Sequence, residues 1–87
     1  MSINDNDLID LDVIFSDNDD SIIINNPKSN FINNFKLYNL IGQSILFSEI
    51  NSIHNFIEYK TNNIQRGIYI ITVKTNNGII SKKLIIK

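Results

Sequence analysis

Short apolar stretches alternate with polar turn sequences along most of the chain. The apolar stretches lie at 12–15, 21–25, 34–49, 54–60 and 67–87. They are rich in Ile, Phe, Tyr and Val, which favour strands, and the period of an amphipathic helix is poor throughout. Because 34–49 and 67–87 are each long enough for two strands and a turn, the pattern predicts about seven short strands.

Closely spaced short strands predict an all-β fold, a small antiparallel, immunoglobulin-like β-sandwich. The sandwich is expected to occupy residues 13–87, whereas residues 1–12 are polar and acidic and predict a flexible linker. The expected core residues are Ile23, Leu37, Ile45, Phe47, Tyr69, Ile71, Val73, Leu84 and Ile86. Gly42 and Gly78 are expected to hold positive φ in two hairpin turns.

The last hairpin is expected to turn at Asn77-Gly78, a dipeptide that suits a type I′ turn because both central residues need positive φ. Pairing outward from this turn places Val73 opposite Lys82 and makes one face of the hairpin mostly apolar. A slip of one residue would bring Lys83 onto that apolar face. The hydrophobic pattern therefore excludes the slip.

Charge and composition exclude several classes of function. The net charge is −1, from 8 basic and 9 acidic residues, so no strong field draws the chain onto nucleic acid. The absence of cysteine excludes disulfides, thiolate metal sites and cysteine nucleophiles. No segment is apolar over the length that a transmembrane helix needs, and the first twelve residues lack the pattern of a signal peptide.

The sequence offers few residues for chemistry. His54 is the only histidine, so a histidine pair for a metal or a proton relay is excluded. Asp17–Asp20 superficially resemble a calcium loop, but the glycine and glutamate that an EF-hand needs are replaced by Ile22 and Lys28. No serine lies in a glycine elbow. The sequence therefore predicts no enzyme, no bound metal and no cofactor.

Two stretches, FKLYNLIGQSI at 35–45 and RGIYIITVKTNNGIISKKLIIK at 66–87, resemble the type A C-terminal sorting domain of the Bacteroidota type IX secretion system. The matched positions are Leu37, Tyr38, Asn39, Gly42 and Gln43 in a strand and turn, Gly67 and Tyr69 at a strand start, Gly78 in a turn, and the closing run Lys82–Lys87. The resemblance covers about residues 13–87. One departure is that Phe15–Asn18 stand where the family commonly has Tyr-Pro-Asn-Pro, so both prolines are missing.

The resemblance implies a non-catalytic signal that takes a longer, N-terminally linked cargo protein through the periplasm and an outer-membrane translocon. A surface sortase then removes the signal, and the cargo remains at the cell surface or outside the cell. The residues that the resemblance assigns to the signal or its partner are Gly67, Tyr69, Gly78, Lys82, Lys83 and Lys87, with Leu37, Tyr38, Gly42 and Gln43 in the turn motif. The acidic start of the chain is the expected cleavage region, because an extended polar linker fits a protease cleft.

Two other functions remain open from the residues alone. An adhesion or carbohydrate-binding appendage would favour exposed aromatics on one flat face, whereas the five phenylalanines are expected mostly in the core. A small self-associating β domain is suggested by the isoleucine runs and by sheet edges without protection.

Overall fold

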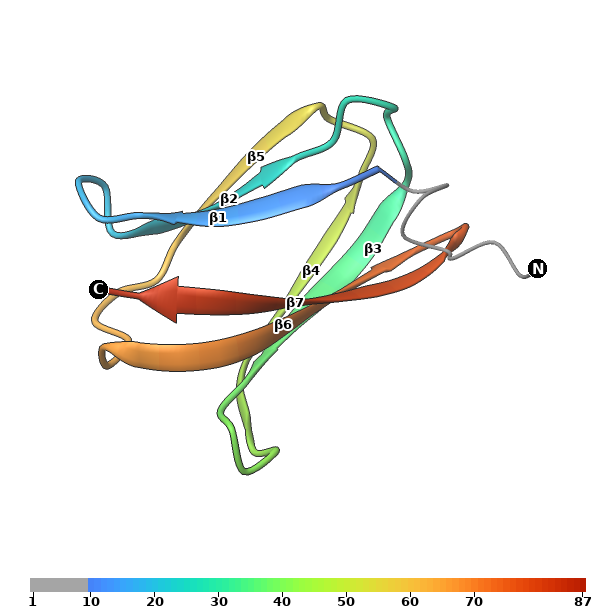
Figure 1. The fold of residues 1–87 in the computed structure, drawn as a ribbon. Helices are drawn as coiled ribbons and strands as arrows, with labels where there is room; N and C mark the ends of the chain where they lie inside the picture. Colours follow the sequence, from blue (N-terminus) through green and yellow to red (C-terminus); the bar gives the residue numbers. More distant parts are fainter. Residues whose placement is uncertain (1–9) are drawn as a thin grey trace.

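The computed structural model describes residues 10–87, which form seven strands in two packed sheets (Figure 1). The strands are β1 (Asp12–Ser16), β2 (Ser21–Asn25), β3 (Ile32–Tyr38), β4 (Ser44–Ser52), β5 (Phe56–Lys60), β6 (Gly67–Thr75) and β7 (Gly78–Ile86). None of the described residues is helical. The predicted all-β, immunoglobulin-like sandwich of about seven strands is confirmed.

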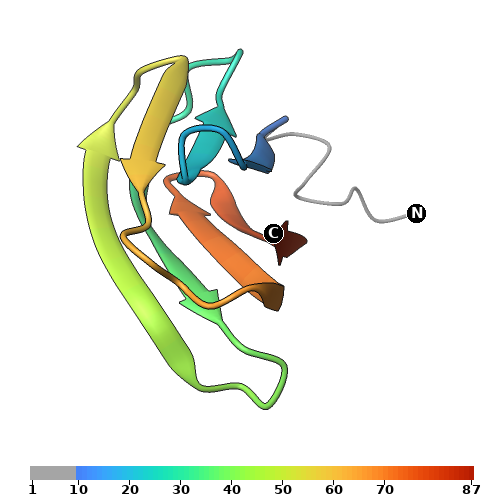
Figure 2. The ribbon, with the colours of Figure 1, turned by 90° about the vertical axis from the view of Figure 1, so that its left-hand side faces the viewer.

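One sheet has the order β1-β2-β5 and the other has the order β4-β3-β6-β7, and every paired neighbour is antiparallel. Consecutive strands β2 and β3, β4 and β5, and β5 and β6 lie in different sheets, so three connections cross between the layers. The edge strands β1 and β7 lie against each other on one side of the sandwich. The edge strands β4 and β5 occupy the other side (Figure 2).

The predicted linker, residues 1–12, lies mostly outside the described residues. Within it, Leu11 is buried and Asp12 is the first residue of β1. The packed part of the chain therefore begins before residue 13.

The core lies between the two sheets, and its largest fully buried side chain is Phe35 of β3. The ring of Tyr59 packs edge-on against Phe35, with ring centroids 5.2 Å apart at 84°. Six predicted core residues belong to the buried cluster: Leu37, Tyr69, Ile71, Val73, Leu84 and Ile86. Burial of such side chains contributes about 1.5–3 kcal/mol each.

The prediction that Ile45 and Phe47 lie in the core is wrong. They are 44% and 49% exposed on the outer face of the four-stranded sheet. Cross-strand partners share a face, and β3 places buried Leu37 opposite Leu46 and exposed Lys36 opposite Phe47. The apolar run at 45–47 has no alternation of its own, so its partner strand decides which side chain points inward.

Ile23 is buried as predicted, but it lies outside the core cluster. Its neighbours Ile22 and Ile24 fill the interior, and successive strand residues point to opposite faces. Ile23 is instead covered on the outer face of the three-stranded sheet, between its pairing partners Ile14 and Glu58. A run of three isoleucines therefore supplies both faces of β2.

The phenylalanines also depart from the expectation that most of them lie in the core. Phe35 alone of the five is fully buried. Phe15 and Phe31 are half-buried, whereas Phe47 and Phe56 are 49% and 60% exposed. The strand register, and not the apolar character of the ring, decides which phenylalanine points inward, as the pairing of Phe47 with exposed Lys36 shows.

The terminal hairpin turns one residue earlier than predicted, at Asn76-Asn77, and Thr75 pairs with Gly78. Every predicted cross-strand partner is therefore displaced by two residues. The Thr75 hydroxyl stabilises this turn, because it accepts the Asn77 N–H at 3.0 Å and donates to the Gly78 carbonyl at 2.9 Å. A displacement of two residues keeps every side chain on its predicted face.

Gly42 and Gly78 both hold positive φ as predicted, at 89° and 138°, although Gly78 opens β7 rather than occupying the turn. Replacing Gly78 by Val is expected to lower the free energy of unfolding by about 1 kcal/mol or more, because a β-branched residue resists this backbone region. Thermal melting measures the loss, with the exposed neighbouring exchange Ile79→Val as the control. If Gly78→Val melts at the same temperature as the unchanged protein, the backbone at residue 78 does not require glycine.

Candidate functional site

The β3–β4 loop is closed by the side chain of Asn39. Its Oδ1 atom accepts the N–H groups of Ile41 and Gln43 at 3.2 and 2.9 Å, and its Nδ2 atom donates to Gln43 Oε1 at 2.8 Å. The Gly42 N–H donates to the Asn39 carbonyl at 3.0 Å. A Cβ atom at Gly42 would meet nothing within 4 Å, so this position needs glycine for its φ and not for space.

This hydrogen bonding explains the spacing between Asn39 and Gly42, and the two residues between them lie in solvent. Leu37 anchors the motif in the core, and Tyr38 is half-buried at the end of β3. Leu40 and Ile41 are 66% and 79% exposed at the tip of the projecting hairpin (Figure 1). The side chains of Leu40 and Ile41 are thus exposed to solvent on a loop whose internal hydrogen bonds fix its shape.

Gly67 and Tyr69 form a second local arrangement at the start of β6. The ring of Tyr69 is buried, and its hydroxyl donates to the Gln65 carbonyl at 2.5 Å. The arrangement is similar to the tyrosine corner of immunoglobulin-like sandwiches, in which a tyrosine hydroxyl holds the preceding connection. The buried ring and its hydroxyl bond hold the connection before β6 in place.

The lysines of β7 separate onto two faces. Lys82 points toward the edge between the sheets and forms an ion pair with Asp12 of β1 at 3.4 Å. Such partly exposed pairs contribute at most about 1 kcal/mol. Lys83 and Lys87 are exposed on the outer side of the four-stranded sheet.

Two more lysines lie on this outer face: Lys74, which the alternation of the last hairpin predicts to point outward, and Lys36, which sequence reasoning missed. Lys36 of β3 and Lys74 of β6 lie there, because Lys36 pairs with Thr72 and Asn34 pairs with Lys74. Among the described residues, neither lysine forms an ion pair, and the same holds for Lys83 and Lys87. We call these four residues the lysine face. Their gathering depends on the register of β3 against β6, which connects distant parts of the chain.

A shallow hollow of about 280 Å³ lies within the lysine face. Its lining residues are Asn34, Lys36, Tyr38, Phe47, Thr72, Lys74 and Ile79. The Lys36 ammonium lies 5.8 Å from the centroid of the Phe47 ring, within range of a cation–π contact. The hollow therefore combines positive charge with apolar surface.

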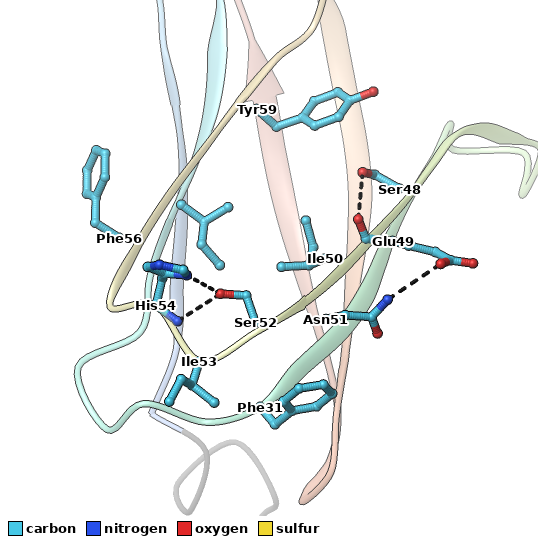
Figure 3. A pocket seen from close by; sticks show the side chains of 11 residues that line it. Phe31, Ser48, Glu49, Ile50, Asn51, Ser52, Ile53, His54, Phe56 and Tyr59 are labelled. Carbon is cyan, nitrogen blue, oxygen red and sulfur yellow. Dashed lines mark hydrogen bonds between the residues drawn. The ribbon is translucent and has the colours of Figure 1, made fainter.

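A larger apolar groove of about 870 Å³ lies between the end of β4 and the start of β5 (Figure 3). Phe31, Ile53 and Phe56 line it, and we call it the β4–β5 groove. His54 at its rim is exposed, and its ring nitrogen Nδ1 contacts the Ser52 hydroxyl. Residues 10–87 contain no group of three or more His, Cys, Asp or Glu placed to hold a metal ion.

The ten residues assigned from sequence do not form one site. Leu37, Tyr38, Gly42 and Gln43 build the projecting hairpin, and Gly67 with Tyr69 orders the start of β6. Gly78 opens β7 and Lys87 follows its last residue, so a whole strand separates them. Of the three lysines named from sequence, Lys83 and Lys87 share the lysine face and Lys82 does not. The sorting roles of these residues stay predictions.

These observations define a small antiparallel β-sandwich with a lysine face on its four-stranded sheet and an apolar groove between β4 and β5. The family model of the secretion system C-terminal sorting domain matches residues 18–87, and the chain belongs to this family, the sorting domains of type IX secretion. A comparison with curated proteins finds none that matches. The chain is thus a C-terminal type IX sorting domain, which implies a cargo protein that is secreted or held at the cell surface.

Domains of this family are generally non-catalytic. In the described part of the chain, no helix is long and apolar enough to cross a membrane.

Proposed function

We propose that this domain directs a longer cargo protein from the periplasm through the type IX outer-membrane translocon, and that a surface sortase then removes the domain. The family match over residues 18–87 carries the proposal. The folded domain is the signal, and the cargo precedes it in the chain. After cleavage the cargo remains at the cell surface or leaves the cell.

The translocon components recognise the lysine face in this proposal. Lys83 and Lys87 belong to the predicted signal, and Lys36 and Lys74 extend the same charge across β3 and β6. Strands hold the backbone of Lys36, Lys74 and Lys83, Lys87 follows directly after β7, and no carboxylate within residues 10–87 forms an ion pair with any of the four. A partner with complementary acidic groups therefore meets several positive charges on one face, which favours its encounter and orientation.

The sortase cleaves within residues 1–12 in this proposal. This stretch is acidic and polar, and it joins the packed domain at Leu11, which is buried next to β1. Cleavage before Leu11 separates the cargo from the sandwich without removing a strand. A compact released domain and an intact cargo are then the two products.

The export test fuses a reporter ahead of residue 1 and follows it in a type IX-competent bacterium. The double change Lys83→Glu and Lys87→Glu is expected to reduce export with a nearly unchanged melting temperature, because exposed substitutions alter stability by less than about 0.5 kcal/mol. The control is Lys28→Glu with Arg66→Glu, which changes the charge equally at two exposed loop residues.

Deletion of residues 79–87 completes the test, and it should trap the reporter in the periplasm. Full export of both the deletion and the Lys83/Lys87 variant refutes the sorting function. Full export of the Lys83/Lys87 variant alone places the recognised surface elsewhere on the domain.

The carbohydrate-binding alternative gains no support from the exposed aromatics. Phe47 lies on the outer face of the four-stranded sheet, whereas Phe56 belongs to the other sheet. A flat aromatic platform needs its rings on one face. Sorting therefore remains the function that we propose.

A further inference from the structure

Exposed hydrophobic side chains are concentrated on one side of the molecule. Six of the ten large hydrophobics that the described residues expose fall between residues 40 and 56: Leu40, Ile41, Ile45, Phe47, Ile53 and Phe56. They lie on β4, on its two flanking loops and at the start of β5. A gathering of exposed apolar side chains around one sheet edge suggests a binding site.

The same side carries the least protected sheet edge. The edges β1 and β5 are only five residues long, and β7 carries two lysines and lies against β1. β4 is nine residues long, contains no lysine or proline, and has no strand beyond it (Figure 2). Short strands and lysines are the usual protection against edge-to-edge pairing, and β4 has neither.

We infer that β4 pairs antiparallel with β4 of a second copy of this chain, forming a two-fold symmetric dimer with a continuous sheet across both copies. We place the centre at Ser48, within the segment from Leu46 to Glu49 over which β4 pairs regularly with β3 between two register shifts, because this centre brings Glu49 next to Lys36 of the second copy. This register places Leu46 opposite Ile50 of the second copy. The short regular segment limits the contact to a few residue pairs on each side of the axis.

Charge complementarity favours a second copy of this chain as the partner of β4. Centring on Ser48 places Glu49 of each copy opposite Phe47 of the other, and the Lys36 ammonium already lies over that ring. Within the described residues, neither Glu49 nor Lys36 has an ion-pair partner in its own chain. A second copy therefore supplies two symmetric Glu49–Lys36 pairs. Centring on Glu49 would instead oppose like charges.

The apolar groups at the two ends of β4 are complementary as well. The Leu40–Ile41 tip lies before β4, and the β4–β5 groove with Ile53 and Phe56 lies after it. Antiparallel pairing brings the tip of each copy alongside the groove of the other. The contact is isologous and uses both free β4 edges, so association stops at two chains.

The dimer leaves the other side of the sandwich free. β1 and β7 lie on the side opposite β4, with Lys83 in β7 and Lys87 directly after it (Figure 2). The inference does not rest on the proposed sorting function, although Lys36 belongs both to the lysine face and to the proposed dimer contact.

Sedimentation equilibrium over a concentration series tests the inference. The average mass of the 87-residue chain is expected to rise from 10.0 kDa toward twice that value. Ile41→Asp is expected to raise the dimer dissociation constant by about tenfold or more, since a charge in an apolar contact is costly. Ile85→Asp, at a residue of β7 with 50% exposure, is the control and should leave dimerisation unchanged. A chain that stays monomeric throughout, or equal weakening by both changes, overturns the inference.

Charge exchange and cross-linking test the register. Lys36→Glu and Glu49→Lys should each weaken the dimer, and the two together should restore it. The chain has no cysteine, so Ser48→Cys should form one disulfide with its symmetry partner under mild oxidation, and Ser81→Cys on β7 should not. Failure of the double exchange to restore dimerisation, or of Ser48→Cys to cross-link, overturns the proposed pairing.

Discussion

Replacing Asn26 by Ala is expected to lower the free energy of unfolding by about 3 kcal/mol, although Asn26 lies in a loop. Its side chain is completely buried between β2 and β3. The Nδ2 atom donates to the Asn30 carbonyl at 2.8 Å and to the His54 carbonyl at 3.0 Å. The Oδ1 atom accepts the Asn30 backbone N–H at 3.0 Å.

The large effect follows from what the substitution leaves behind. Removing the amide leaves the buried backbone groups of Asn30 without this hydrogen-bond partner. An unpaired buried polar group costs about 1–3 kcal/mol. The network also extends to the terminal hairpin, because Asn77 Nδ2 donates to Asn30 Oδ1 at 2.9 Å. One end of the sandwich therefore depends on a single amide.

Chemical denaturation measures this loss against Asn25→Ala. Asn25 is half-buried at the end of β2, next to Asn26 in the chain. The two variants remove the same groups, so their difference isolates the buried network. Equal stabilities of the two variants contradict the proposed importance of Asn26.

Much of the fold could be predicted because β7 and β6 alternate clearly. Tyr69, Ile71 and Val73 on one strand, and Leu84 and Ile86 on the other, mark the same inward face. Alternation fixes which face is buried, and that face is confirmed. It does not fix the pairing partner, because a shift of two residues buries the same side chains. The Thr75 side-chain bonds, which favour a turn at Asn76-Asn77, decide between the two registers.

The surface could be predicted less well because it depends on contacts between distant residues. The local sequence around Lys36 gives no sign that Lys74 lies near it, since only the pairing of β3 with β6 brings them to one face. The buried network of Asn26 has the same origin, because its partner His54 is 28 residues away. An asparagine beside a proline predicts a turn, and burial of that turn is a tertiary effect.

Leu84→Ala provides the test that separates the fold of the terminal strand from its proposed signal. Leu84 is 3% exposed in the core, and its neighbour Lys83 is exposed on the lysine face. Truncating Leu84 is expected to cost about 3 kcal/mol, from lost burial and the cavity that remains. A domain of this size is stable by only about 5–10 kcal/mol, so the loss approaches half of its stability.

Temperature then distinguishes the two causes of failed export. The reporter fused to Leu84→Ala is expected to lose export at high growth temperature and to recover it at low temperature, where the weakened domain stays folded. The variant with Lys83→Glu and Lys87→Glu retains its fold, so its export should stay low at both temperatures. Circular dichroism of each purified domain shows whether it is folded at the temperature of the export measurement. Recovery of both variants on cooling would mean that β7 acts through stability alone. If only the lysine variant fails to be exported at both temperatures, the partner contacts the outward side chains at the end of the chain. The inward side chains of β7 then serve to hold the strand in place.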